Sequence, residues 1–127
     1  MHQELKQLNV SIGRYFEGYT TIEIDLVKGQ STFSQWGGSA PKKVASQTLS
    51  EEVMANFLES LAQTDFLNWD KTYLNSESYE GTRWSVEIIT NENRTKKYGE
   101  NKFPKEWNLF CDLIEELALN NEENSLV

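Results

Sequence analysis

The spacing of apolar residues changes along this chain, and that change restricts the folds it can adopt. In residues 20–27 apolar and polar side chains alternate, which is typical of a strand with one buried face. From Leu49 the apolar residues recur every three or four positions, and the same spacing returns after Pro104. That spacing places them on one side of a helix. The sequence therefore predicts strands, a helix, more strands and a second helix.

Strand patterns occur at residues 10–16, 20–27 and 31–36, and again in a hairpin at 83–98. Helices are expected near 50–64 and 104–119. Ser50 is suited to be the N-cap of the first helix, because Glu51 and Glu52 follow it in the first turn. Pro104 is suited to the first turn of the second helix, where its missing N–H breaks no bond.

Two segments lack a sustained period. Residues 37–47 are expected to form a loop, since they are small and polar and Pro41 cannot donate a ladder hydrogen bond. Residues 65–82 are expected to form a packed connection with a helical turn, anchored by aromatic side chains. The predicted fold is α+β: an antiparallel sheet of about five strands with two helices on one face, in the order strand, strand, strand, helix, loop, strand, strand, helix.

Length and composition predict one domain over residues 1–127, with an ordered core at about 9–119. The chain contains one Cys and one His, which excludes an intramolecular disulfide and a multi-cysteine metal site. The N-terminal residues 1–9 are polar and lack the apolar stretch of a signal peptide. We therefore expect a cytoplasmic protein.

The charge of the chain limits its partners. Twelve basic residues against twenty acidic ones give a net charge of −8, which is unfavourable for binding nucleic acid or an anionic membrane. Residues 106–127 contain six acidic residues and no Lys or Arg. Asp112, Glu115 and Glu116 are expected on the outer face of the second helix. We interpret them as a candidate surface for a basic protein, with a solubilising surface as the alternative.

Aromatic residues at the ends of elements or in connections form a second candidate set. Such residues are common at interfaces, although packing in the core is the simpler explanation. The candidates for a pocket or an interface are Trp36, Trp69, Tyr73 and Tyr79.

Patterns that would indicate catalysis are incomplete. Gly13 and Gly18 have the spacing of a phosphate-binding loop, but Tyr19 follows where the Lys that reaches the phosphates would be required. Cys111 falls on the apolar stripe of the second helix and has no His near it in sequence. We therefore predict no catalytic residue, no metal site and no cofactor.

Several segments resemble a group of small bacterial domains of unknown function. The similar segments are 13–25 (GRYFEGYTTIEID), 49–66, 81–88 (GTRWSVEI) and 97–104 (KYGENKFP). Relatives tend to have Asp-Gly where this chain has Glu80-Gly81, and a smaller residue followed by Tyr where it has Lys102-Phe103. The resemblance spans about residues 9–119 and implies an α+β fold, without an activity.

These observations favour a bacterial cytoplasmic domain that binds another protein and has no enzymatic activity. One concrete form is an inhibitor or immunity-type protein that presents an acidic surface to a basic toxin or nuclease. The alternative is a small-ligand-binding domain, or an enzyme, with its site between the 65–82 connection and the sheet.

Overall fold

Four antiparallel strands follow one another at the start of the chain in the computed structural model, which describes residues 4–14, 18–37, 41–74 and 81–119. They are β1 (Leu5–Arg14), β2 (Gly18–Asp25), β3 (Gln30–Trp36) and β4 (Pro41–Thr48). The alternation that predicted the first three strands is confirmed by their burial, since Val10, Ile22, Ile24 and Phe33 lie in the core. The first strand begins at Leu5, five residues before its predicted start.

The expectation of a loop at 37–47 is wrong from Pro41 onward, because Pro41–Thr48 forms β4. Pro41 is the first residue of this strand, opposite Trp36, and the register shifts by a bulge between Gln35 and Trp36. Because β4 lies at the edge of the sheet, a residue without an N–H group is tolerated at its start. Burial alternates from Val44 to Thr48, but the apolar Val44 is on the exposed side and Gln47 is on the half-buried side. The sequence of this strand therefore lacks the apolar alternation that marks a buried face.

The second half of the chain completes the sheet. The predicted hairpin is β6 (Thr82–Thr90) and β7 (Arg94–Glu100), and β6 pairs with β1. A short strand, β5 (Thr72–Leu74), runs parallel to β7 and was not predicted. The sheet therefore has seven strands in the order β4-β3-β2-β1-β6-β7-β5, where about five antiparallel ones were expected, and only the β5–β7 pair among the described strands is parallel.

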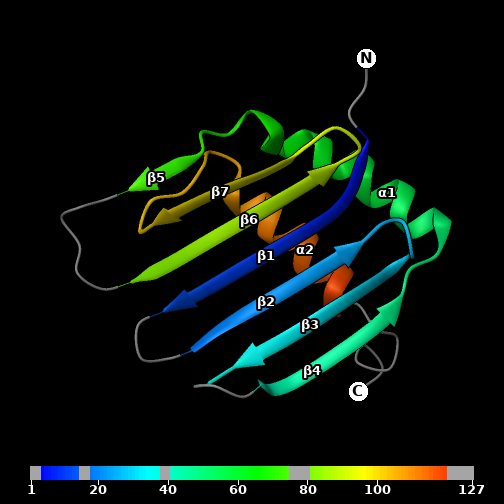
Figure 1. The fold of residues 1–127 in the computed structure, drawn as a ribbon, viewed down its shortest axis with the longest axis horizontal. Helices are drawn as coiled ribbons and strands as arrows, with labels where there is room; N and C mark the ends of the chain where they lie inside the picture. The colour runs from blue at the N-terminus through cyan, green and yellow to red at the C-terminus, as the bar shows by residue number, and fades with distance from the viewer. Residues whose placement is uncertain (1–3, 15–17, 38–40, 75–80, 120–127) are drawn as a thin grey trace.

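Two helices cover one face of this sheet, as predicted (Figure 1). They are α1 (Glu51–Leu61) and α2 (Trp107–Leu119). The second helix begins three residues later than expected, so Pro104 precedes α2 and does not lie in its first turn. Ser50 is the N-cap of α1, and its side chain accepts a hydrogen bond from the Val53 N–H at 3.1 Å. The opposite face of the sheet carries no helix of the described chain (Figure 1).

The described part of the connection after α1, residues 62–74, is packed and partly helical, as its aromatic content predicted. It contains two single-turn 3-10 helices, η1 (Ala62–Thr64) and η2 (Phe66–Asn68), before β5. Asp65 between them has a φ of 57°, the left-handed conformation that turns the chain from one to the other. None of the described helices is long and apolar enough to cross a membrane.

Candidate functional site

The helical layer brings the predicted acidic residues to the surface. Phe110, Ile114 and Leu117 of α2 are buried against the sheet. Asp112, Glu115 and Glu116 project from the same helix and are exposed, as predicted. Ion pairs among the described residues join Lys6 to Glu4, Arg83 to Glu100 and Arg94 to Glu87, all on or beside the sheet.

Helix α1 extends the acidic surface in a way that the sequence analysis missed. It packs against α2, and its exposed residues include Glu51, Glu52 and Glu59. Neither helix contains a Lys or Arg, and each contains three acidic residues. The sequence feature that could have shown this is the absence of Lys and Arg between Ser50 and Leu61. It gains meaning only when α1 is known to lie beside α2, because the two acidic surfaces then join.

A small groove lies between the two helices. Its volume is about 170 Å³, and it is lined by Val53, Asn56, Phe57, Ser60, Leu113, Glu116 and Leu117. Of the three predicted acidic residues, only Glu116 lines the groove. Four of its seven lining residues are apolar, and the acidic lining residue is Glu116. This arrangement suits an apolar side chain, or the aliphatic stem of a Lys or Arg whose charged end reaches a carboxylate.

Burial and two neighbouring carboxylates act together on the Cys111 thiol. Its pKa is raised to about 12, first by burial, then by the charges of Glu115 and Asp112. A thiol with such a pKa is almost entirely protonated at neutral pH and is a poor nucleophile. This chemistry agrees with a structural role for Cys111.

The predicted aromatic candidates lie in different places. Trp69 is buried, with its ring centroid 5.0 Å from that of Phe110 and 6.2 Å from that of Trp84. Tyr73 packs on Trp84 at 5.8 Å, so both belong to the same aromatic cluster. Trp36 lies outside it, on the uncovered face of the sheet, with its ring parallel to that of Tyr19. Tyr79 lies outside the described residues.

This aromatic cluster occupies the space proposed for a ligand between the 65–82 connection and the sheet. It consists of Trp69, Tyr73, Trp84, Trp107 and Phe110. Gly99 permits the close packing, because a Cβ there would lie 2.6 Å from Nε1 of Trp84 and 2.7 Å from the Tyr73 carbonyl oxygen. The described part of this connection is therefore packed with rings against the sheet.

Lys97 is a second residue that the sequence analysis missed. It faces inward from β7 and is 4% exposed. Its Nζ donates hydrogen bonds to the carbonyl oxygens of Phe66, Leu67 and Trp69, at 3.0, 2.7 and 2.7 Å. Burial lowers the pKa of Lys97, while nearby Asp70 and Asp65 oppose that shift. Since a lysine ammonium has three donors, this geometry uses all of them to hold the connection to the sheet.

No group of His, Cys, Asp and Glu side chains able to hold a metal ion occurs in the described part of the chain. Comparison of the sequence with models of known protein families found no match, and comparison with curated proteins found none either.

Proposed function

We propose that this chain is a non-enzymatic, protein-binding domain whose helical layer contacts a basic protein. The observation that carries the proposal is the pairing of two neighbouring helices, each with three acidic residues and no basic one, around an interhelical groove. The negative charge of the surface attracts a basic partner, and the groove between the helices favours one orientation of that partner over others.

The surface is costly in local stability, which supports selection for binding. Asp112 and Glu116 are a like-charged pair four residues apart, and acidic residues near the C-terminus of α2 oppose its dipole. A partner rich in Lys and Arg would relieve both effects. We place this interaction in the bacterial cytoplasm and interpret it as inhibitor-like or immunity-like, with a basic toxin or nuclease as the partner.

The alternative, a site for a small ligand behind the 65–82 connection, receives less support. Aromatic rings occupy that space, and the buried ammonium of Lys97 is already bound to three carbonyl oxygens. An enzymatic site would need a polar group free to react with a substrate, and the raised pKa of Cys111 disfavours its use as a nucleophile.

A triple charge reversal, Asp112→Lys, Glu115→Lys and Glu116→Lys, tests the proposal. The purified chain is used to capture proteins from the source cells, and captured proteins are identified by mass spectrometry. We expect a stoichiometric basic partner that the reversed variant fails to retain. Its association with the wild-type chain should slow steeply as salt is raised, because exposed charges are screened.

The matched control reverses three acidic residues on or beside the sheet: Glu23→Lys, Glu92→Lys and Glu100→Lys. It changes the net charge by the same amount but leaves the helices intact. This control should retain the partner. If both variants lose it equally, the interaction depends only on net charge; if neither loses it, the partner binds elsewhere. Either result would refute the proposed surface.

A further inference from the structure

A larger groove lies on the other side of α1, between this helix and the ends of the strands. We call it the α1–sheet groove. Its volume is about 740 Å³, within the range of about 300–1,000 Å³ typical of ligand clefts. Most of its lining is apolar: Leu5, Leu26, Met54, Leu58, Phe66 and Leu67. Leu58 and Leu67 are 39% and 49% exposed, so the apolar lining reaches the surface.

The position of α1 explains why this groove exists. The helix packs against α2 and η1, whereas α2 packs on β2 and β3. Of the eleven residues of α1, only Phe57 and Leu61 are fully buried. On the side toward the groove, Ala55 contributes no more than a methyl group. The helix therefore leaves space beside the sheet that its own side chains do not fill.

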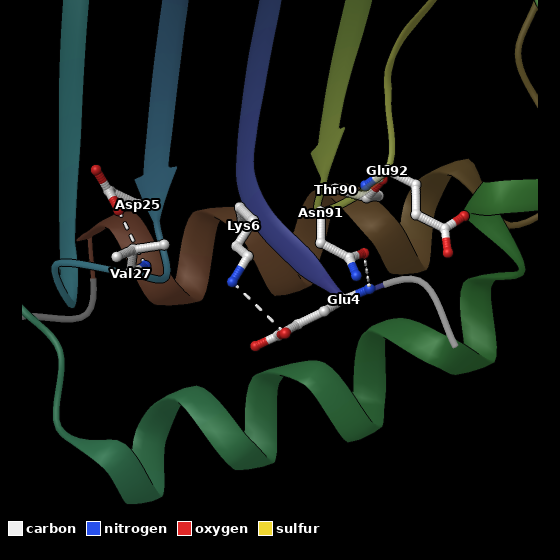
Figure 2. A network of polar contacts seen from close by, with 7 residues as sticks. All are labelled: Glu4, Lys6, Asp25, Val27, Thr90, Asn91 and Glu92. Carbon is white, nitrogen blue, oxygen red and sulfur yellow. Dashed lines mark hydrogen bonds and ion pairs between the residues drawn. The ribbon is translucent and has the colours of Figure 1, made fainter. Parts of the chain in front are cut away.

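Polar contacts hold one wall of the groove in place. The Glu4 N–H donates to Oδ1 of Asn91 at 2.8 Å, and the Asn91 N–H donates to the Glu4 carbonyl oxygen at 3.0 Å (Figure 2). Thr90 Oγ1 accepts from the N–H groups of Glu92 and Asn93, which fixes the turn that carries Asn91. The start of β1 is thus attached to the β6–β7 turn, so this wall is organised before any ligand binds.

The charges at the groove favour a cationic occupant. Glu4 lines the groove from the sheet side, and Glu51 lines it from the first turn of α1. Figure 2 shows the Glu4 side chain between the strand ends and α1, with Lys6 beside it. The Lys6–Glu4 pair is 3.5 Å long, and the Glu4 side chain is 71% exposed, so a cation from a partner can reach the Glu4 carboxylate and compete with Lys6 at little cost.

We propose that the α1–sheet groove binds a segment of the basic partner, in which apolar side chains enter the groove and an adjacent Lys or Arg reaches Glu4 and Glu51. This inference rests on the proposed function, because it assumes a partner that contacts the acidic helical layer. It adds the chemistry of the contact segment: an apolar anchor next to a basic residue. Helix α1 would then be held by the partner on both of its sides.

Calorimetric titration with synthetic peptides tests this inference directly. The probe is a twelve-residue peptide of leucine and lysine, and the control is a peptide of the same length and charge in which serine replaces leucine. We expect the leucine-lysine peptide to bind at least tenfold more tightly. Equal affinity for the two peptides, or absence of binding by the leucine-lysine peptide, would overturn the proposal.

Two variants locate the binding. Ala55→Arg places a long cationic side chain in the groove from α1, and Leu67→Arg does the same from η2. Gln63→Arg is the matched control, since this exposed residue of η1 does not line the groove. Each groove variant should weaken binding of the leucine-lysine peptide at least tenfold, and Gln63→Arg should change it less than twofold. Because Leu67 is outside α1, its variant remains informative if Ala55→Arg disturbs the helix.

The captured partner separates this inference from the proposed function. If the triple reversal on α2 releases the partner while Ala55→Arg and Leu67→Arg retain it, the proposed binding by the acidic surface of α2 is supported and the groove proposal fails. If the groove variants release it while the triple reversal retains it, the proposed α2 surface fails. Release by both groups of variants, with retention by Gln63→Arg, supports the two together.

Discussion

The two helices cover the same sheet but contact it in different ways. Beneath the start of α2, the rings of Trp84 and Trp107 lie 4.6 Å apart, and Trp69 and Phe110 complete a filled core. Beside α1 there are grooves on both sides, and apolar residues such as Val53 and Leu58 remain exposed. The comparison indicates that the tightest packing lies under α2, while α1 leaves apolar side chains exposed beside two grooves.

The largest expected effect on the free energy of unfolding comes from the aromatic core beneath α2. Trp84 is 3% exposed, and its Nε1 donates to the Lys102 carbonyl oxygen at 2.9 Å. Trp84→Ala should lower the free energy of unfolding by about 3–5 kcal/mol, because it removes a buried ring and leaves a cavity. Chemical denaturation measures this loss. Tyr98→Ala, on the uncovered face of the same hairpin, is the control, and comparable losses in both variants would contradict the comparison.

Lys97→Met should have the next largest effect. The substitution keeps an unbranched side chain but leaves three carbonyl oxygens without their donor. We expect a loss of about 2–4 kcal/mol, together with a change in the fluorescence of Trp69, whose carbonyl oxygen is one of the three. The control is Lys96→Met, the exposed neighbour on the opposite face. If both variants unfold at the same denaturant concentration, the three hydrogen bonds do not hold the connection.

The Cys111 thiol should react slowly in the folded chain. Its pKa is raised from 9.0 to about 12, so near pH 9 the folded state holds far less thiolate than the unfolded state. Because the alkylation rate follows the thiolate fraction, reaction with iodoacetamide should be about five-hundredfold slower in the folded than in the unfolded chain at that pH. Equal rates would show that the thiol is neither buried nor close to the acidic surface.

The same shift has a consequence for stability above pH 9. There the unfolded chain loses the thiol proton first, so the folded state binds more protons and the free energy of unfolding falls as pH rises. Cys111→Ala should remove this part of the pH dependence. Subtracting the curves of the two proteins isolates the thiol from the lysines and tyrosines that titrate in the same range.

The smallest effect on stability is expected on the acidic surface. The triple reversal of Asp112, Glu115 and Glu116 should change the free energy of unfolding by less than about 1 kcal/mol, because all three are exposed. Its sign should be stabilising, since positive charges suit the C-terminal half of a helix. A large destabilisation would show that these residues support the fold, and the contrast between the α1 and α2 sides would then need revision.

Local pattern accounts for the elements that were predicted. The period of two in β2 and β6 and the period of three to four in α1 and α2 depend only on neighbours in sequence, so each element could be recognised alone. The exposure of Asp112, Glu115 and Glu116 followed from the same helical geometry. β4 and β5 were missed because an edge strand beginning with Pro41 and a three-residue strand carry little periodic signal.

The amino-acid sequence by itself determined the α+β character of the chain, the amphipathic helices and the acidic outer face of α2, because these arise from contacts over a few residues. Tertiary structure alone decided the burial of Lys97, whose three acceptors come from a segment about thirty residues away. It also decided the two grooves beside α1, since their walls come from α1, α2 and the ends of the strands. A groove is the space that packing leaves unfilled, and its shape is set only when distant elements meet.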